Sequence, residues 1–236
     1  MKEIKLKNKE QIAEGTMAFF FEKPSDFEFK ADQSVDLYLI DPKENDEEGT
    51  KRAFSIASAP FEEDLMIATR MRDTAFKRIL ATMLPGDPIN MDGPFGSVTL
   101  HNDASKPAVF LTGGIGITMF RSIILQALHD QAPHQLYLFY SNRKPEDASF
   151  LEELMSLQKD NFKCIPTMTQ IGTSAQNWIG ETGYITQEML SKYVPDLQSP
   201  IYYVAGPRRM VSGMYQMLIK AGINSDNIRT EEYDGY

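Results

Sequence analysis

The sequence is poor in residues that hold metals or inorganic clusters. It contains one cysteine, Cys164, and three scattered histidines. A single cysteine cannot form an intramolecular disulfide or supply the thiolates of an iron–sulfur cluster, and the histidines do not form a zinc-binding pattern. We expect no metal site, so any demanding chemistry depends on an organic cofactor or on ordinary side chains.

Long apolar runs and an excess of basic residues are also missing. The longest apolar runs, such as 107–111 and 201–205, are far shorter than the roughly 20 residues that cross a bilayer. The N-terminus lacks the apolar core of a signal peptide. Lys and Arg number 24 against 33 Asp and Glu, and this charge of -9 disfavours nucleic-acid binding. These features predict a soluble cytoplasmic protein without a membrane span.

The first hundred residues have mostly the period of β-strands. Apolar residues alternate with polar ones at 35–39, 65–69 and 89–91, and Pro and Gly separate these runs. The pattern predicts a small antiparallel barrel. Only residues 74–84 have helical spacing, with Asp73 or Thr74 as the N-cap, and this helix is expected to cover one end of the barrel.

The rest of the 236-residue chain alternates short apolar runs with helix-length amphipathic segments. The predicted strands are 108–112, 136–140, 162–168 and 201–205, and the predicted helices lie near 117–130, 147–159, 186–193 and 208–221, with Gly222 as a C-cap. Crossover helices of this length predict a parallel sheet covered on both faces. The expected domains are residues 1–104 and 105–236.

Three glycines follow the first predicted parallel strand. Gly113, Gly114 and Gly116 lie just before a helix that begins near Ile117, and Thr118 adds a hydroxyl. Backbone N–H groups at such a turn can approach a pyrophosphate at the positive end of the helix. The spacing is not G-x-G-x-x-G, and a tight strand-to-helix turn is the alternative.

Two further turns belong to the same expected sheet edge. The second parallel strand ends without an acidic residue, and Ser141 with Arg143 could hold a ribose 2′-phosphate there, which favours NADPH over NADH. Arg143 as a solvated surface residue is the alternative. Ala205-Gly206-Pro207 opens a later helix and is expected to face the same crevice, or simply to start that helix with proline.

Other features are interpreted as structural. The acidic run 41–48 is expected to form a solvated loop between strands, because clustered like charges repel. Cys164 is expected in the core, and His101, His129 and His134 in solvent.

Arg52, Phe54 and Ser55 lie in the barrel half, and Arg52 and Phe54 share one face of a strand. A guanidinium there could bind a phosphate while the ring stacks on a planar cofactor. The motifs that follow in the chain are Arg70-Met-Arg-Asp-Thr-Ala-Phe-Lys77, Gly86-Asp-Pro-Ile-Asn-Met-Asp-Gly-Pro-Phe-Gly96, the glycine turn, Ala205-Gly-Pro207 and Glu231-Glu-Tyr-Asp-Gly-Tyr236. Their order resembles the ferredoxin-NADP reductase superfamily across nearly the whole chain.

This resemblance implies a Greek-key FAD barrel followed by a nicotinamide-binding α/β domain, without an iron–sulfur domain. It implies that Arg52 binds the flavin phosphates, that Phe54 stacks on the isoalloxazine, and that Ser55 lies near N5. The implied cofactor-binding residues are Arg52, Phe54, Ser55, Thr69, Arg70, Thr74, Ala75, Phe76, Thr112, Gly113, Gly114, Gly116, Ile117, Thr118, Ser141, Arg143, Ala205, Gly206 and Pro207. The implied catalytic residues are Ser55, Glu231, Tyr233 and Tyr236.

The chain departs from the family pattern at three places. Phe54 replaces a tyrosine, Ala205 replaces a cysteine that lines the nicotinamide site, and the tail continues past Tyr233, so either Tyr233 or Tyr236 could cover the flavin.

The resemblance implies a flavoenzyme that passes hydride from NADPH or NADH to FAD, and electrons to a separate acceptor that the sequence does not identify. A flavin-binding sensor or regulatory subunit without efficient turnover is the alternative, favoured by Ala205. A third possibility is a dinucleotide-binding protein without flavin. An acidic redox partner would need a local basic cluster, for which the candidates are Arg70, Arg72, Lys77 and Arg78. The oligomeric state is not predicted.

Overall fold

The structure is a computed structural model that describes residues 1–233. By its internal contacts the chain divides into two compact units. The first contains residues 1–99 and 118–129, and the second contains residues 100–117 together with the chain from residue 130. Helix α2 (Ile117–His129) therefore groups with the N-terminal strands. Within the first unit, Arg121 donates to the Ala57 carbonyl at 2.8 Å, and the Ser122 hydroxyl donates to the Ser58 carbonyl at 2.8 Å.

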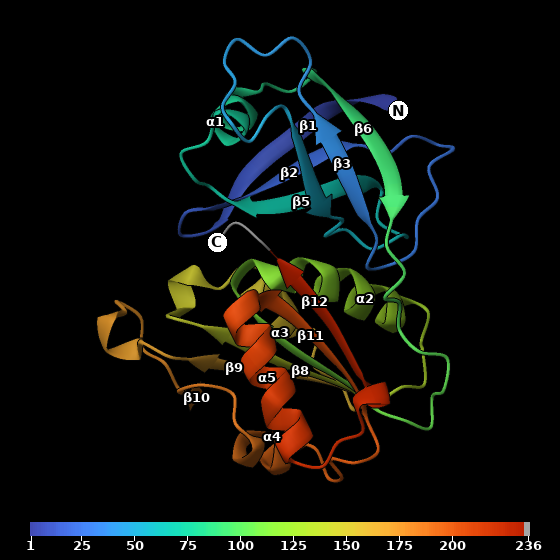
Figure 1. Ribbon diagram of the computed structural model, residues 1–236, viewed down its shortest axis with the longest axis vertical. Coiled ribbons are helices and arrows are strands. Elements are labelled where there is room, and N and C mark those ends of the chain that lie inside the picture. Colours follow the sequence, from blue (N-terminus) through green and yellow to red (C-terminus); the bar gives the residue numbers. More distant parts are fainter. Residues whose placement is uncertain (234–236) are drawn as a thin grey trace. The chain divides into compact units, whose positions relative to one another are not determined.

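The first unit is built on an antiparallel sheet (Figure 1). Its strands are β1 (Lys2–Ala13), β2 (Thr16–Glu22), β3 (Ser34–Tyr38), β4 (Lys51–Ser55), β5 (Asp64–Arg70) and β6 (Pro88–Phe95), in the spatial order β4-β3-β6-β1-β2-β5. An isolated bridge between Ile56 and Ile67, and a 2.7 Å hydrogen bond from Ala57 N to Met66 O, join the two edges. The sheet is thereby closed into a barrel, as the alternating pattern predicts.

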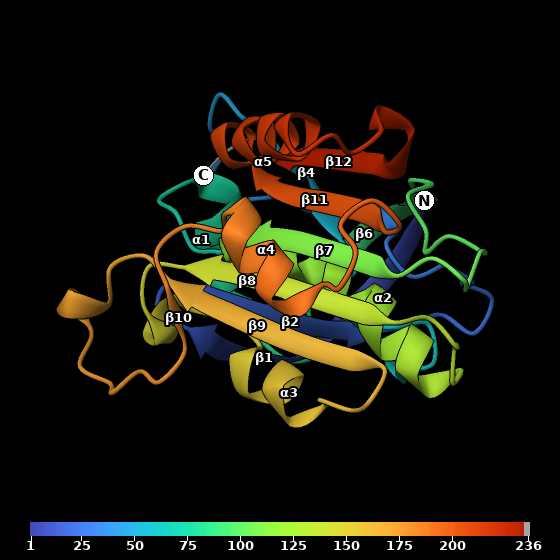
Figure 2. The same ribbon diagram turned by 90° about the horizontal axis from the view of Figure 1, so that it is seen from below.

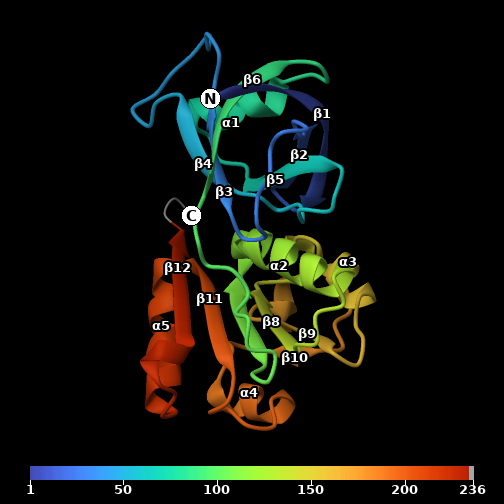
Figure 3. The ribbon, with the colours of Figure 1, turned by 90° about the vertical axis from the view of Figure 1, so that its right-hand side faces the viewer.

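The single helix of the barrel half also matches its prediction. Helix α1 (Ala75–Thr82) places Phe76 and Leu80 in the barrel core. Figure 3 shows this helix beside the strands of the first unit. Thr74 is the N-cap, and its hydroxyl accepts a hydrogen bond from Lys77 N. An N-cap hydroxyl satisfies one of the backbone donors that the first turn leaves free, so a threonine favours the start of a helix here.

The second unit contains a six-stranded sheet (Figure 2). Its strands are β7 (Ala108–Gly113), β8 (Leu136–Asn142), β9 (Phe162–Met168), β10 (Glu181–Thr182), β11 (Ile201–Pro207) and β12 (Ile228–Tyr233), all parallel and in the order β10-β9-β8-β7-β11-β12. Its helices are α3 (Leu151–Ser156), α4 (Gln187–Tyr193) and α5 (Arg208–Lys220), and its 3-10 turns are η1 (Gly114–Gly116), η2 (Pro145–Asp147), η3 (Ile171–Thr173) and η4 (Ser225–Asn227).

Most of the predicted elements of this half are present. Strand β7 lies in the interior of the sheet between β8 and β11, so successive connections move away from it in opposite directions. In α/β sheets, ligands bind at such a switch point, outside the carboxyl ends of the strands. Gly222 closes α5 with φ +81°, and Ile223 N donates to Leu218 O at 3.1 Å, which confirms the predicted C-cap.

The second half also differs from the expectation at three elements. Helix α3 is shorter than the predicted 147–159, because Phe150 has a left-handed φ of +58° and the helix starts after it. The additional strands β10 and β12 carry no apolar run in their sequence, so periodicity did not indicate them.

Two of the three histidines are not in solvent, which corrects the expectation. His101 and His134 are only 8% and 6% exposed. The His101 ring bonds to the Tyr203 hydroxyl and the Lys106 carbonyl at 3.0 and 2.9 Å, and His134 Nε2 bonds to the His101 carbonyl at 2.9 Å. These partners replace water. Cys164 is buried as predicted, and burial raises the pKa of its thiol to about 12.

No helix within residues 1–233 is long and apolar enough to cross a membrane.

Candidate functional site

Strand register brings the predicted nicotinamide-site residues of the second unit to one edge of its sheet. Gly113 pairs with Ser141, Thr112 pairs with Ala205, and Ala205 pairs in turn with Glu231. Parallel strands end at the same edge, so four segments that are distant in sequence meet there. This edge carries the switch point between β7 and β11.

The glycine turn requires its glycines for two different reasons. Gly114 has φ +55°, in the left-handed region. A Cβ on Gly116 would lie 2.8 Å from Thr112 Oγ1 and 2.9 Å from Ala205 O, and a Cβ on Gly113 would lie 2.6 Å from Met210 Sδ. The turn is therefore tightly packed, which agrees with the alternative interpretation of a tight strand-to-helix turn.

The same turn also suits an anion. Helix α2 begins directly after η1, and its first turn contains no acidic residue. No acidic side chain of that turn therefore repels an anion at the positive end of the helix dipole. The Tyr140 hydroxyl lies 3.2 Å from both Gly114 O and Ser149 O, which fixes the turn against β8. Sequence analysis did not find this role of Tyr140, and only its place before Ser141 could have suggested it.

The tip of β8 carries the two residues expected to choose between NADPH and NADH. Ser141 is half-buried and Arg143 is exposed. Among residues 1–233 the guanidinium of Arg143 forms no ion pair, so it is available to an anionic ligand.

The ends of β11 and β12 complete this edge. Ala205 is fully buried, Gly206 has φ +151°, and Pro207 is the N-cap of α5, so proline also starts that helix. Burial raises the pKa of Glu231, beside Ala205. Tyr233 pairs with Pro207 and is half-buried. Tyr236 lies outside the described residues.

In the first unit, three predicted flavin residues form one cluster. The rings of Phe54 and Phe76 have centroids 5.9 Å apart, and the Arg52 guanidinium lies 5.4 Å from the Phe76 ring centre. Arg52 and Phe54 share a face of β4 as predicted. Phe54 is 8% exposed and belongs to the barrel core, so its stacking on a flavin stays a prediction.

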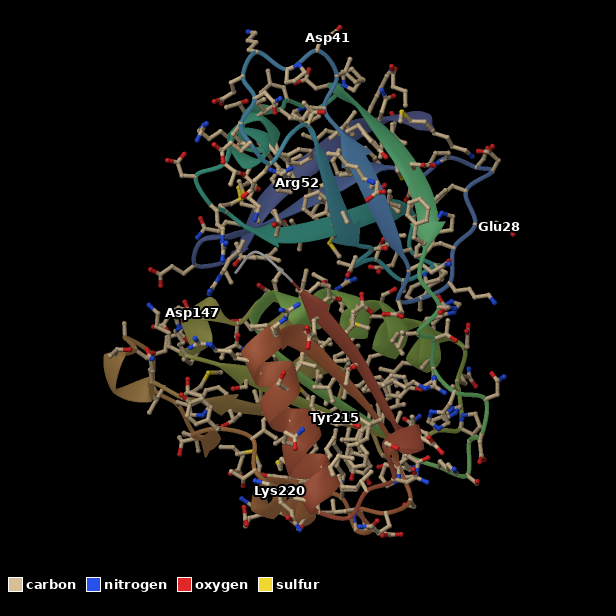
Figure 4. All side chains as sticks on the ribbon, viewed as in Figure 1. Glu28, Asp41, Arg52, Asp147, Tyr215 and Lys220 are labelled. Carbon is tan, nitrogen blue, oxygen red and sulfur yellow. The ribbon has the colours of Figure 1, made fainter. Side chains whose placement is uncertain are left out.

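The acidic run 41–48 is an exposed loop between β3 and β4, as predicted, and some of its carboxylates also bind neighbouring donors. Glu48 Oε2 lies 2.6 Å from an Arg52 nitrogen, and the Glu48 carbonyl also accepts from Arg52 at 2.6 Å. Asp46 Oδ2 accepts from the backbone N–H of Ala75, at the start of α1, at 2.6 Å. Carboxylates thus occupy the donors expected to hold phosphate, which shows that this donor set fits an anion. Figure 4 labels Asp41 on this loop and Arg52 beyond it.

The remaining flavin-site candidates lie around this cluster. Ser55 ends β4, and Thr69 is buried near the end of β5. The Arg70 carbonyl accepts from Lys77 Nζ at 2.6 Å. Burial lowers the pKa of Lys77 to about 8. Among residues 1–233, no group of three or more His, Cys, Asp or Glu side chains could hold a metal ion.

Solved structures share this two-part architecture. A ferredoxin NADP+ reductase from Neisseria gonorrhoeae, solved with bound FAD and NADP, matches with a TM-score of 0.78 and 24% identity, over 98% of both chains. A cytochrome P450 reductase from Amycolatopsis matches with a TM-score of 0.81 and 19% identity, over 98% of this chain and 69% of that one. These similarities establish the fold.

The model of the oxidoreductase NAD-binding domain matches residues 110–216, from β7 into α5. The chain thus has a ferredoxin-NADP reductase-like fold that contains a segment similar to this NAD-binding domain. The matched segment contains both the glycine turn and the Ala205-Gly206-Pro207 turn.

The curated relatives of this chain are longer proteins. A subunit of the Na(+)-translocating NADH-quinone reductase from Methylococcus capsulatus is 28% identical over 202 residues, which are 78% of this chain and 49% of that protein. The corresponding protein from Pseudoalteromonas atlantica is 27% identical over 226 residues, 88% of this chain and 54% of that protein. The chain spans about half the length of the curated relatives it matches.

Proposed function

We propose that this chain is an oxidoreductase that takes hydride from NADPH or NADH onto noncovalently bound FAD and passes the electrons to a separate acceptor. The observation that carries the proposal is the meeting of Gly113, Ser141, Ala205 and Glu231 at one edge of the parallel sheet. When bound, FAD accepts the hydride at N5 and releases electrons to the acceptor. The protein supplies binding and orientation for this reaction.

We assign nicotinamide binding to residues 105–236. The N–H groups of the turn from Thr112 to Thr118 hold the pyrophosphate, and the packing of Gly116 keeps that backbone in place. Ser141 and Arg143 bind the adenosine ribose, with Arg143 selecting the 2′-phosphate of NADPH. The quinone-reductase relatives are named for NADH, whereas the Neisseria reductase was solved with NADP, so variants of Arg143 must decide the preference.

We assign flavin binding to residues 1–104. Arg52 and the N-terminus of α1 bind the phosphates, Phe54 packs against the isoalloxazine, and Ser55 lies near N5. Thr69 and Arg70 support the same site, beside Lys77. The Glu231 carboxyl, whose pKa burial raises, assists proton movement during hydride transfer.

Ala205 supports the second candidate, a flavin-binding sensor or regulatory subunit that turns over slowly. A methyl group stands where the family has a thiol, which affects positioning of the nicotinamide more than the fold. A partner within a larger assembly fits the quinone-reductase relatives, which are named as subunits. The basic cluster suggested for an acidic partner is partly used internally, because Arg78 pairs with Glu44 at 2.7 Å. A small-molecule acceptor needs no such cluster.

Turnover with an artificial acceptor tests the proposal. The purified chain is reconstituted with FAD and mixed with ferricyanide and either NADPH or NADH, and oxidation of the nucleotide is followed by absorbance. We expect turnover that disappears when the flavin is removed. Turnover that is independent of flavin, or absent with both nucleotides, would contradict the enzyme proposal.

A further inference from the structure

The acidic loop between β3 and β4 is attached to its surroundings at three alternate residues. Asp46 Oδ2 accepts from Ala75 N at 2.6 Å, Glu48 pairs with Arg52 at 2.6 Å, and Glu44 pairs with Arg78 at 2.7 Å. Residues 46–49 form a turn, in which Gly49 N donates to Asp46 O at 3.0 Å. The three ionic contacts show that the loop presents its carboxylates to α1 and β4.

Besides these carboxylates, the Glu48 and Gly49 carbonyls attach the loop, because they accept from Arg52 at 2.6 and 3.2 Å. No residue from 41 to 48 is buried. The side chains of Asp46 and Glu48 are 30% and 60% exposed. Residues 41–48 contribute no side chain to the barrel core, although Leu39 before them packs against it. Residues 41–48 can thus separate from α1 without withdrawing a side chain from the core.

The two donors that the loop occupies are the ones proposed for the flavin phosphates. A carboxylate and a phosphate oxygen are both anionic acceptors, and each forms charge-assisted hydrogen bonds with a guanidinium or with N–H groups at a helix start. The bond from Ala75 N is the main reason that the pKa of Asp46 is lowered. Asp46 is therefore ionised at neutral pH and competes with phosphate as a full negative charge.

We propose that Asp46 and Glu48 act as an internal substitute for the flavin phosphates, so that the loop and FAD bind Arg52 and α1 in alternation. The inference rests on the proposed function. FAD can bind only when the loop has left these donors, because the two sets of anions would otherwise repel each other at one site. The apparent affinity for FAD is then reduced by the fraction of molecules in which the loop is closed.

A pair of double variants tests this alternation. Asp46→Ala with Glu48→Ala removes the two competing carboxylates. Glu28→Ala with Glu47→Ala is the matched control, because it removes the same charge from two exposed positions. The affinity of apo-protein for FAD is measured by quenching of flavin fluorescence, and the thermal midpoint of the apo-protein is measured in parallel.

We expect opposite changes in the two measurements. The Asp46 and Glu48 double variant should bind FAD about tenfold more tightly, as expected from removing a competing charged hydrogen bond. Its apo form should melt at a lower temperature, because Ala75 N has lost its carboxylate partner and Arg52 keeps only backbone carbonyls. The control should match the wild type in both. Weaker or unchanged FAD binding in the Asp46 and Glu48 variant would overturn the inference.

Riboflavin, which has no phosphate, makes the test specific. Its affinity should be equal in the wild type and both variants, and a gain equal to that for FAD would overturn a phosphate-based competition. Failure of FAD to bind any of the three proteins would instead overturn the proposed function, and the inference with it. Equal FAD affinity in all three would leave the proposed function intact and remove only the alternation.

Discussion

Arg143 is the residue on which the preference between NADPH and NADH depends. Only the 2′-phosphate of NADPH offers its guanidinium a charged partner, so Arg143→Ala should raise the KM for NADPH about five- to tenfold and leave the KM for NADH nearly unchanged. Steady-state kinetics with both nucleotides provide the measurement, and Lys220→Ala at the end of α5 is the control. Equal increases for the two nucleotides, or a wild type that prefers NADH, would refute the assignment.

Arg52 should determine how much flavin the purified protein retains. Arg52→Ala removes a charged partner of the phosphates, which costs about 1.5 to 3 kcal/mol of binding free energy. The flavin-to-protein absorbance ratio of the purified variant should therefore fall well below that of the wild type. Unchanged occupancy would show that Arg52 serves only the acidic loop.

His101 predicts how stability depends on pH. Burial lowers the pKa of its ring below the ordinary 6.5, and the charges of His134 and Arg229 act in the same direction. The unfolded chain therefore binds the proton first as the pH falls, so stability is retained above pH 6.5 and lost progressively below it. Denaturation followed by fluorescence of the single Trp178 should show a steeper loss of stability below this pH in the wild type than in His101→Gln. Identical slopes would contradict the prediction.

Sequence analysis missed the partners of polar residues that bind distant segments. His101 is buried because Tyr203, about a hundred positions later, supplies its hydrogen bond. Asp46 is bound because α1 begins beside it. Composition and periodicity report local preference, and neither contains such pairings. Arg52 and Phe54 were predictable because alternation along one strand fixes their common face.

Alanine substitutions at Gly116, in the glycine turn, and at Gly213, in α5, should have opposite effects on stability. Gly116→Ala places a Cβ within 2.9 Å of Ala205 O and should destabilise the second unit and weaken dinucleotide binding. Gly213→Ala places its Cβ in open space on α5, where alanine should stabilise by about 0.5 to 1 kcal/mol. Chemical denaturation and NADP+ titration measure both. A neutral Gly116→Ala variant would show that the turn can relax.

Variants at the C-terminal end of the chain should show whether Tyr233 or Tyr236 covers the flavin. A ring that occupies the place of the nicotinamide must leave before hydride transfer, because the nicotinamide has to approach the flavin there. It can leave because stacking contributes only about 0.5 to 1.5 kcal/mol. Tyr233→Ser, or deletion of residues 234–236, should therefore strengthen nicotinamide binding, and the variant that does so identifies the ring. Should both leave nicotinamide affinity and the flavin spectrum unchanged, the match at Glu231 was misread.

Regular elements with an apolar pattern were predictable, and elements without one were not. Strands β7, β8, β9 and β11 are buried and apolar, so they appear as runs in the sequence. Strand β12 has the polar sequence Ile-Arg-Thr-Glu-Glu-Tyr and is held by pairing with β11. Neither the place of β12 at the edge of the sheet nor the pairing of Ala205 with Glu231 can be predicted without the spatial order of the strands.

For the chain as a whole, the strand-like apolar period of the first half predicted the barrel. The alternation of apolar runs and helical segments in the second half predicted the parallel sheet. The cut near residue 104 stays a prediction, and so do the cytoplasmic location, the acceptor and any partner. The matched segment covers only about half of each relative, so the relatives' assemblies do not define the acceptor of this chain.

Noncovalent FAD is a prediction for the whole molecule. Arg52 and the start of α1 offer donors for two phosphates, whereas FMN has only one and would use half of them. Heat-released flavin, identified by chromatography, should therefore be FAD. Recovery of FMN would contradict the two-phosphate assignment, and a colourless protein that cannot be reconstituted would favour a dinucleotide-binding protein without flavin.

Anaerobic mixing of the FAD-loaded protein with one equivalent of NADPH or NADH tests the central claim most directly. Hydride transfer onto the bound flavin should bleach its visible absorption rapidly, without any added acceptor, and later admission of an acceptor should restore the yellow colour. Bound flavin that stays oxidised with both nucleotides would contradict the account and favour a sensor or regulatory subunit.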